Sequence, residues 1–598
     1  MTPTTVPVDQ GGDKGRPAEP DPGAAWCDTT VPPTHEVTNQ VPELVGHDAA
    51  ADPPLLEALD REGAGWARGE LHEIGVLAGS SRVREWADAA HRHEPRLRTH
   101  DRAGNRVDEV DYDRGYHALL DVAVSRGLAG AVWADAREGA HVARGAEFLV
   151  WSQAETGHGC PISMSHAVLP ALRGAPDLLA QYGPGLTSRV YEPGLRPPRG
   201  KAGLPAGMGM TEKQGGSDVR ATTTSADPVG DHYVLTGHKW FTSAPMSDLF
   251  LVLAQVAGTR SAAEPDHRAG TRSAAEPDHR EGGLTCFLVP RVLPDGTRNP
   301  FRIQRLKDKL GNRSNASSEP EFDGTLGWRV GDEGRGVRTI IEMVACTRLD
   351  NALGSAAGMR AALTLAAHHV RHRRAFGRAL IDQPLMRSVL ADLALESEAA
   401  VTLSLRLAGA HDRAHRGSAP ETAFRRIGVT LGKYWICKRQ TAVVGEALEC
   451  LGGNGYLEES GMPRLFRESP LNSIWEGSGN VNALDLLRVL AREPDAVAAY
   501  GDEVDASAGA DTRLDAAWKE LRQDLREPDE AQARVLAERM ALVLQGSLLV
   551  RHAPSAVADA FVGSRIAGDH GYAAGTLPRG TDLDAILDRL PETTRSGA

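Results

Sequence analysis

The segment GMTEKQGGSDVRA, residues 209–221, combines small residues with hydroxyl groups in a way that suits ligand binding. Gly215, Gly216 and Ser217 let the backbone approach a ligand closely, and Thr211 and Ser217 offer hydroxyls to a phosphate or to ring oxygens. Composition alone would make the segment a turn. It is not the common dinucleotide site, because no G-x-G-x-x-G follows a strand in this chain.

The composition and the spacing of apolar residues change along the chain on either side of this segment. Residues 1–33 are rich in Pro, Gly, Asp and Thr without periodicity, which predicts a disordered tail. From 34 to 205 apolar residues recur at helical spacing, which predicts an all-helical region. Between 206 and 325 short apolar runs such as LFLVLAQVA and LTCFLVP alternate with Gly, Pro and Asp turns, which predicts a small β domain.

Helical patterns return after the β region. They predict a second helical domain over 326–490 and an appended helical domain over 491–598. Inside the β region the sequence AGTRSAAEPDHR occurs twice in tandem, at 257–268 and 269–280. The repeat is polar and rich in turn residues, so we expect an expanded surface loop at 257–280.

The bulk composition narrows the class of protein. A chain of 598 residues exceeds one core, and 41% hydrophobic with 25% charged residues is ordinary for globular domains. The six cysteines form no C-x-x-C pair, so neither a disulfide framework nor a metal site is expected. Without a signal-peptide core or a long apolar run, we expect a cytoplasmic protein with no membrane partner. The net charge of −13 argues against a general nucleic-acid coat protein.

Two segments together carry a family resemblance. Residues 209–221 resemble the first signature of the acyl-CoA dehydrogenase superfamily, and ECLGGNGYLEESGMPRLFRE, residues 449–468, is similar to the second. The resemblance covers about 34–595. It implies an α+β, mainly α fold with an N-terminal helical domain, a small central β-barrel or sandwich, a C-terminal four-helix-bundle domain and the appended helical domain. It also implies non-covalent FAD as the cofactor.

The resemblance assigns the first cofactor contacts. Met210 and Thr211 would contact the flavin ring, and Ser217 the pyrophosphate. The RRAFG motif taken alone is an ordinary basic helix end, but it resembles a family element that reaches the FAD of a neighbouring subunit. Arg373 and Phe376 would make that contact, so the resemblance implies a homotetramer.

The segment GHKWFTS, residues 237–243, looks like the family strand in which an aromatic ring covers the flavin and a hydroxyl meets its hydride-accepting nitrogen. In that register Phe241 and Ser243 take the two roles, with Thr242 between them as a further contact. Trp240 would compete for the stacking role after a one-residue shift, but such a slip turns the other side chains to the wrong face. A purely structural core strand is the alternative.

In the second signature, Gly452 and Gly453 permit close approach of the backbone to the cofactor. Glu459 and Arg464 in the same segment are expected to form a structural ion pair.

The segment NSIWEGSGN, residues 472–480, resembles the family segment that carries the catalytic carboxylate, here Glu476. The reaction removes a proton beside a thioester, so the base must be desolvated and its pKa raised toward neutrality. Some relatives place the base on an earlier helix, at a position that is Thr347 here, so Glu476 has no rival there. A purely structural hydrogen bond is the alternative role for Glu476. The other cofactor contacts implied in this segment are Trp475, Gly477, Ser478, which is also expected to cap a helix, and Asn480.

Several stretches, among them ETGHGCPISM and RLKDKLGNRSNASSE, look like the AidB-type branch of the superfamily. Two functions therefore compete. One is α,β-dehydrogenation of a short or branched acyl-CoA, with electron-transferring flavoprotein or another acceptor as partner. The other is a flavoprotein that binds double-stranded DNA through its C-terminal domain and protects it against alkylation, with little dehydrogenase activity.

Charge opposes the second function. Residues 491–598 hold 12 Lys and Arg against 19 Asp and Glu, which is unfavourable for phosphate binding. A local basic patch would have to come from a few side chains that are otherwise ordinary solvated residues. The candidates are Arg488, Lys519, Arg522, Arg551 and Arg565.

Overall fold

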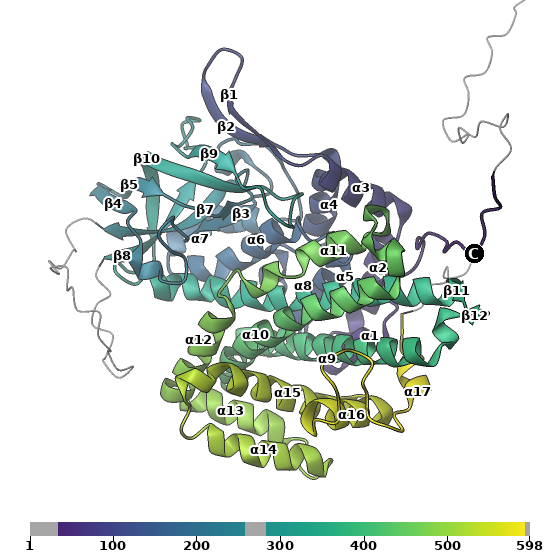
Figure 1. Ribbon diagram of the computed structural model, residues 1–598. Coiled ribbons are helices and arrows are strands. Elements are labelled where there is room, and N and C mark those ends of the chain that lie inside the picture. The colour runs from purple at the N-terminus through teal and green to yellow at the C-terminus, as the bar shows by residue number, and fades with distance from the viewer. Residues whose placement is uncertain (1–33, 257–282, 592–598) are drawn as a thin grey trace, which may run out of the picture. The chain divides into compact units, whose positions relative to one another are not determined.

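The computed structural model describes residues 34–256 and 283–591. The predicted disordered tail at 1–33 and the predicted surface loop at 257–280 lie outside the described residues. The chain divides into two units, 1–40 and 41–598, and every described helix and strand belongs to the second unit (Figure 1).

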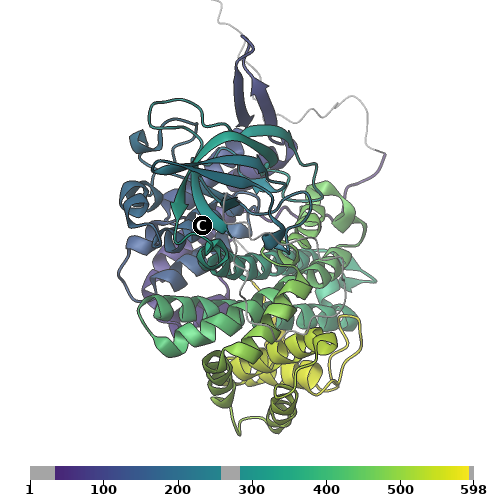
Figure 2. The ribbon, with the colours of Figure 1, turned by 90° about the vertical axis from the view of Figure 1, so that its left-hand side faces the viewer.

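The N-terminal part of this unit is mainly helical. The helices are α1 (Pro53–Arg61), α2 (Arg68–Ala78), α3 (Ser81–Arg92), α4 (Arg114–Ser125), α5 (Ala140–Ser152), α6 (Gly159–Leu172) and α7 (Pro176–Leu186). An antiparallel hairpin of β1 (Arg96–His100) and β2 (Arg106–Asp111) corrects the all-helical prediction for this region (Figure 2). The hairpin forms because RVDEVD alternates in burial, and its Val110 joins the apolar core of the strand domain.

The central strands close into a small barrel. They are β3 (Ala206–Gly209), β4 (Ser225–Val229), β5 (His232–His238), β6 (Thr242–Ser243), β7 (Leu249–Val256), β8 (Leu284–Pro290), β9 (Arg302–Leu306) and β10 (Ser317–Val330). Pairing runs from β7 through β4, β5, β10 and β8 back to β7, with β7 parallel to β4 and the other neighbours antiparallel. β3, β6 and β9 extend the sheet at its margins.

Strand β7 is buried on both faces, and its alternation separates two cores. Phe250 and Val252 point into the barrel, where Phe287 of β8 meets them. Leu249 and Leu251 point outward and pack with residues of α6 and α8. A continuous apolar run is the pattern expected of a strand that is covered on both sides.

Long helices dominate the second half of the chain. They are α8 (Gly336–His372), α9 (Pro384–His415) and α10 (Ala419–Cys450), followed by α11 (Met462–Glu468) and α12 (Gly479–Arg492). A tight turn between β11 (Arg374–Ala375) and β12 (Arg378–Ala379) connects α8 to α9. Pro384 occupies the first position of α9, where a proline costs no hydrogen bond.

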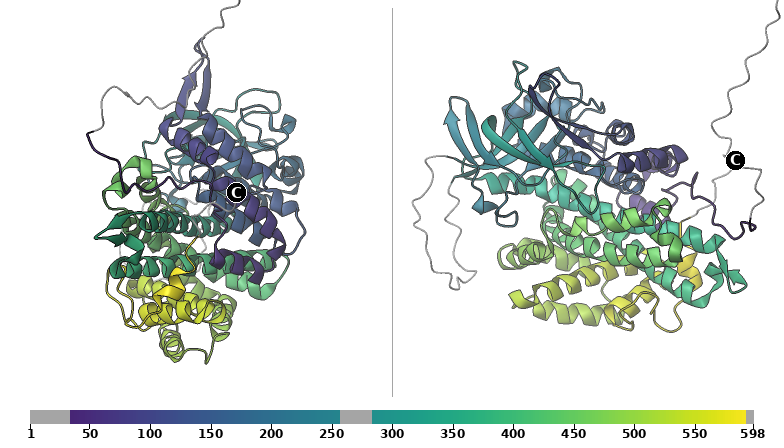
Figure 3. Two further views of the ribbon diagram at one scale, coloured as in Figure 1. Left: turned by 90° about the vertical axis from the view of Figure 1, so that its right-hand side faces the viewer. Right: turned by 45° about the horizontal axis from the view of Figure 1, so that its top comes forward.

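The C-terminal helices pack on the side of α9 and α10 opposite the strand domain (Figures 1 and 3). They are α13 (Pro494–Asp505), α14 (Thr512–Asp524), α15 (Ala533–His552), α16 (Ser555–Phe561) and α17 (Leu583–Leu587). Their buried residues belong to one continuous core with α9, α10 and α12. This arrangement confirms the α+β, mainly α fold class. Among the described helices, none has the length and apolar character that crossing a bilayer requires.

Candidate active site

Glu476 sits where the chain bends sharply between a short helical turn, Leu471–Ser473, and α12. Its backbone has φ of 55°, a conformation that residues other than glycine rarely adopt, and Gly477 follows with φ of 101°. The bend turns the carboxylate toward α8, where Thr347 Oγ1 donates a hydrogen bond of 3.0 Å to Glu476 Oε2. Strained backbone of this kind concentrates at functional sites.

The bend is held by side chains from other helices. Arg348 Nε of α8 donates to the carbonyl of Glu476 at 3.0 Å, and Lys433 Nζ of α10 donates to the carbonyl of Gly477. Arg348 is anchored in turn by Asp485 of α12 at 2.8 Å. Burial alone would raise the pKa of Asp485, but its contacts with Arg426 and Arg348 outweigh burial and lower the pKa to about 2. The bend is therefore braced by the ion pair of Arg348 and Asp485.

The electrostatics of Glu476 suit a general base. Burial raises its pKa above the ordinary value, while the hydrogen bond from Thr347 and the charges of Arg348 and Lys433 oppose the rise. Burial also lowers the pKa of Lys433 to about 8. A carboxylate with a raised pKa holds an abstracted proton more readily at neutral pH.

Strand β6 and the residue before it, Phe241, carry three of the expected flavin contacts. Phe241 is 51% exposed, and Ser243 Oγ lies 3.3 Å from Ser317 Oγ of β10. Thr242 points the other way and is buried against Gly209, as the alternation of a strand requires. The structure thus brings Phe241 and Ser243 together and leaves the side chain of Thr242 apart from them.

A partly buried lysine contacts the serine that lies beside the hydroxyl of Ser243. Lys309 Nζ donates to Ser317 Oγ at 3.1 Å, and Ser317 in turn contacts Ser243. Burial lowers the pKa of Lys309 to about 8. Burial also raises the pKa of the neighbouring Cys160 thiol to about 11, although its hydrogen bond with Ser243 opposes the rise. Sequence reasoning missed these roles, because it used the stretches that contain Cys160 and Lys309 only to recognise the branch.

A buried ion pair fixes the first signature onto the neighbouring strand. Lys239 Nζ lies 2.7 Å from Glu212 Oε1, and Trp240 N donates to the carbonyl of Thr211 at 2.8 Å. Burial lowers the pKa of Lys239 to about 8, with Glu212 opposing. The pair holds Met210 and Thr211, both partly buried, beside the strand that carries the flavin contacts.

A wide groove of 2010 Å³ runs from the first signature toward α12. Ser217 lies exposed at one end, while Val481 and Asp485 line the part nearest Gly477. Arg220, Arg338 and Arg492 line the groove, as do Arg426 and Arg488, which are paired with Asp485. Guanidinium groups and a small-residue loop together suit a ligand that carries phosphates.

A separate apolar cavity of 290 Å³ lies behind β6 and the start of α6. Pro161 and Ala244, the chain neighbours of Cys160 and Ser243, form part of its wall. Its other lining residues include Tyr112, Tyr116, Leu120, Ile162, Tyr191 and Met246.

The remaining cofactor candidates lie at the far end of the long helices. Along α8, Arg373 comes 26 residues after Thr347, roughly 39 Å at the helical rise. Phe376 is 95% exposed at the tip of the β11–β12 turn, with φ of 51°. Gly452 and Gly453 begin the turn after α10, roughly 26 Å beyond Lys433. One bound cofactor at Glu476 does not reach these residues within the same chain.

Two local expectations need correction. Arg464 pairs with Asp88 of α3 at 2.9 Å and not with Glu459, whose carbonyl accepts from Arg84. Ser478 does occupy the position before α12, which begins at Gly479 and includes Asn480, but its side chain makes no capping hydrogen bond. Nearby, Trp475 Nε1 donates to Asn472 Oδ1 at 2.9 Å, which fixes the indole beside Glu476 in the chain.

Most of the candidate DNA contacts are engaged inside the chain. Arg565, 9% exposed in its side chain, is paired with Asp392 and Glu396 of α9. The other ion pairs are Arg488 with Asp485, Arg522 with Asp505, and Arg551 with Glu503. Lys519 is exposed on α14. An arginine already neutralised by a carboxylate is a poor phosphate ligand, so this arrangement does not favour DNA binding by these residues.

Comparison with known protein families finds three consecutive matches along the chain. Residues 39–193 match the N-terminal domain of the adaptive response protein AidB. Residues 207–325 and 334–491 match the middle and C-terminal domains of acyl-CoA dehydrogenases.

Relatives that align over most of the chain point to the same family. The chain is 43% identical over 532 residues to AidB of Escherichia coli (strain K12), covering 88% of this chain and 94% of the relative. It is 29% identical over 502 residues to acyl-CoA dehydrogenase family member 11 of Caenorhabditis elegans, covering 79% and 78%. The crystal structure of Caenorhabditis elegans ACDH-11 in complex with C11-CoA aligns with a TM-score of 0.75 at 25% identity, over 93% of each chain. The apo form of Bd2924 aligns with a TM-score of 0.76 at 28% identity, over 87% of this chain and 100% of the other. The chain belongs to the acyl-CoA dehydrogenase family and, within it, to the AidB-type branch.

Proposed function

We propose that this protein oxidises the bond between the α and β carbons of a short or branched acyl-CoA thioester, with Glu476 as the base. Glu476 takes the proton from the α carbon, and a hydride leaves the β carbon as the double bond forms. The observation that carries the proposal is the carboxylate of Glu476, partly buried, oriented by Thr347 and raised in pKa. An ordinary structural carboxylate needs neither the strained backbone nor the raised pKa.

FAD is the cofactor, and the residues on the β6 side fit it. Phe241 offers an exposed aromatic face beside the hydroxyl of Ser243. At Gly215 an added Cβ would meet no atom within 4 Å, so the loop leaves open space for a ligand. Ser217 lies at the end of the arginine-lined groove, where a pyrophosphate would be held. When bound, FAD supplies the acceptor for the hydride.

The apolar cavity behind β6 suits the acyl chain. Its wall is aromatic and aliphatic, and it adjoins Ser243 through Ala244 and Glu476 through the neighbourhood of Cys160. An acyl tail seated there would exclude water from the carboxylate and strengthen the electrostatic interactions around it. The relative solved in complex with C11-CoA supports an acyl-CoA as the class of ligand.

The far-end residues indicate a site completed by a second copy of the chain. Arg373, Phe376, Gly452 and Gly453 lie too far from Glu476 to touch the same cofactor in one chain. A homotetramer in which each cofactor lies between copies would use them, and the fully exposed Phe376 is the kind of side chain that such an interface buries. Electron-transferring flavoprotein as the final acceptor stays a prediction from the family resemblance.

The test is anaerobic bleaching of the bound flavin by a panel of acyl-CoAs, covering straight short, branched short and medium chains. We expect rapid bleaching by at least one short or branched member. The matched control is Glu476→Gln, which keeps the shape of the side chain and removes its basicity. A wild-type protein that retains FAD but is bleached by no acyl-CoA would contradict the proposal.

A further inference from the structure

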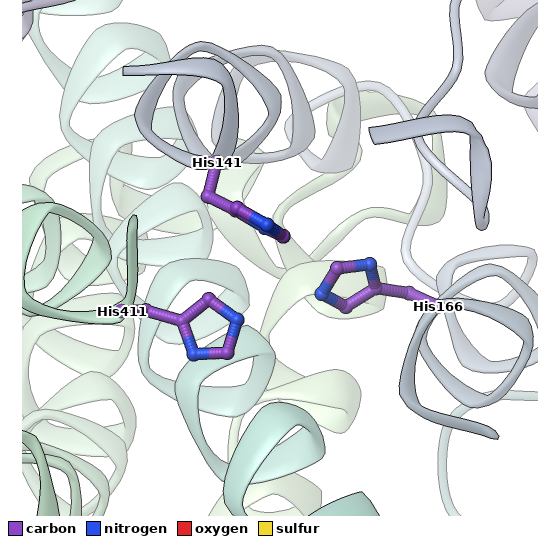
Figure 4. Close-up of side chains that lie close together, drawn as sticks. All are labelled: His141, His166 and His411. Carbon is purple, nitrogen blue, oxygen red and sulfur yellow. The ribbon is translucent and has the colours of Figure 1, made fainter. Parts of the chain in front are cut away.

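Three histidines from three helices converge in the helical core (Figure 4). His141 lies on α5, His166 on α6 and His411 on α9, and their exposures are 5%, 3% and 2%. One nitrogen from each ring lies within 4.8 Å of the others. Sequence spacing gives no hint of the cluster, since the three positions belong to separate segments.

Several ring nitrogens of the cluster lack hydrogen-bond partners within the described residues. Within the described part of the chain, no hydrogen bond is made by either ring nitrogen of His141, by Nδ1 of His166 or by Nε2 of His411. Buried polar atoms are nearly always paired, so such a concentration of unpaired ones calls for an explanation. An ion at their centre would satisfy all three rings.

Two of the three histidines also have partners outside the cluster. A backbone hydrogen bond with Ala129 favours the protonated form of His166 and opposes the effect of burial on its pKa. Arg425 Nη1 lies 3.3 Å from Nδ1 of His411. Burial lowers the pKa of His141 to about 3 and lowers the pKa values of His166 and His411 well below the ordinary value. All three rings are therefore neutral at pH 7, the form that binds metals.

The ring geometry is close to that of a three-histidine centre. Ring centroids are 4.8 Å apart for His141 and His411, 5.8 Å for His141 and His166, and 6.2 Å for His166 and His411. Rings that share one ion at metal–nitrogen distances of about 2.0–2.1 Å have centroids roughly 5 Å apart. Small rotations of His166 would complete the geometry. Trp133 stacks on His166 at 5.1 Å and closes one side of the cluster.

The surrounding charges decide which ion fits. Arg173 lies against Trp133 and donates to His415, and Arg425 approaches His411, so the local potential is positive. The adjacent carboxylate of Asp412 is occupied by the backbone N–H groups of Gly139 and His141. The cost of burying an ion grows with the square of its charge, so a divalent ion is disfavoured where the ligands are neutral.

We propose that His141, His166 and His411 bind a single monovalent copper ion. Binding through Nε2 of His411 moves its proton to Nδ1, so Arg425 must turn away. Arg425 is only partly buried and lines the wide groove, which gives it room to do so. A bound ion would join α5, α6 and α9, and through α6 it would stiffen the helix whose Ile162 lines the apolar cavity.

The experiment titrates the full-length FAD-loaded protein with Cu⁺, anaerobically, against a chromophoric copper chelator, and separately with Zn²⁺. We expect one equivalent of Cu⁺ per chain, weaker binding of Zn²⁺, and a melting temperature raised by several degrees. X-ray absorption should show nitrogen neighbours at about 2.0 Å and no sulfur, which separates this site from the cysteines.

His166→Phe keeps an aromatic ring against Trp133 and removes a ligand, so it should weaken Cu⁺ binding about 100-fold or more while FAD content stays unchanged. His141→Phe repeats the test if the first variant fails to fold. His72→Phe, at an exposed histidine paired with Asp48, is the control and should bind as the wild type does. The proposal is overturned if the protein does not bind one Cu⁺ per chain, or if sulfur binds the ion. It is also overturned if Zn²⁺ binds more tightly than Cu⁺, or if neither variant changes the affinity for Cu⁺.

Discussion

The region around Glu476 and the C-terminal ends of α8 and α10 differ in how many contacts they make within the chain. Around Glu476, Thr347 inside α8 and Lys433 near the middle of α10 hold the bend through hydrogen bonds within the chain. Beyond the C-terminal ends of α8 and α10, Phe376 is 95% exposed in a strained turn, and a Cβ added at Gly452 would meet no atom within 4 Å. On the proposed function, one chain builds the chemical half of the site and only presents the other half. We predict that the second half acquires its role when another copy of the chain brings it to the cofactor.

The largest effect should come from a substitution of Glu476. Glu476→Gln should lower the rate of acyl-CoA-dependent flavin bleaching by about 10²- to 10⁴-fold, because a positioned general base is lost. FAD content should remain that of the wild type, as the amide keeps the shape of the carboxylate. Stopped-flow absorbance under anaerobic conditions measures both. Equal bleaching rates in the variant and the wild type would remove Glu476 from the mechanism.

A smaller effect is expected from a substitution of Arg373, at the C-terminal end of α8. Arg373→Ala should weaken FAD binding by about 10- to 100-fold, through loss of a charge-assisted hydrogen bond to phosphate from a second copy. Bleaching per bound flavin should stay unchanged, since Glu476 is intact. Arg378→Ala, on the same turn, controls for a general loss of positive charge. Unaltered FAD affinity in Arg373→Ala would indicate that this end takes no part in the site.

A finer effect concerns the pKa of Glu476. Thr347→Val removes a donor that favours the ionised carboxylate, so the pKa should rise further. Bleaching requires the ionised base, so its rate increases with pH through this pKa, and the acidic limb should move about 1–2 pH units upward. Thr364→Val, at a buried threonine of α8 whose hydroxyl donates to the carbonyl of Arg360, is the control. A pH profile identical to that of the wild type would show that Thr347 does not act on the base.

Local sequence patterns predicted much of this molecule. The mainly α fold class, the AidB-type branch and FAD are confirmed, because each depends on short motifs or on periodicity along the chain. Phe241 and Ser243 share a face because strand alternation is a local property. Their roles toward the cofactor, like the role of Glu476, stay predictions.

The parts that the sequence did not reveal depend on contacts between distant segments. Lys433 reaches Gly477 across 44 positions, and Lys309 reaches the flavin strand through Ser317. Arg464 was wrongly paired, because its true partner, Asp88, lies 376 positions away and no local spacing favours it. The three-histidine cluster was missed for the same reason.

We propose that the region of Glu476 and the region of Arg373 meet in one site formed by different copies of the chain. Glu476→Gln and Arg373→Ala chains, carrying different affinity tags, are co-expressed, and mixed oligomers are isolated by both tags in succession. In each mixed pair one site inherits both defects and the other inherits neither, provided that the interface is reciprocal. We predict that the mixed oligomers regain FAD and acyl-CoA-dependent bleaching in about half of their sites, at the wild-type rate. Mixed oligomers that perform no better than the average of the two parents would show that each chain works alone and would contradict the account.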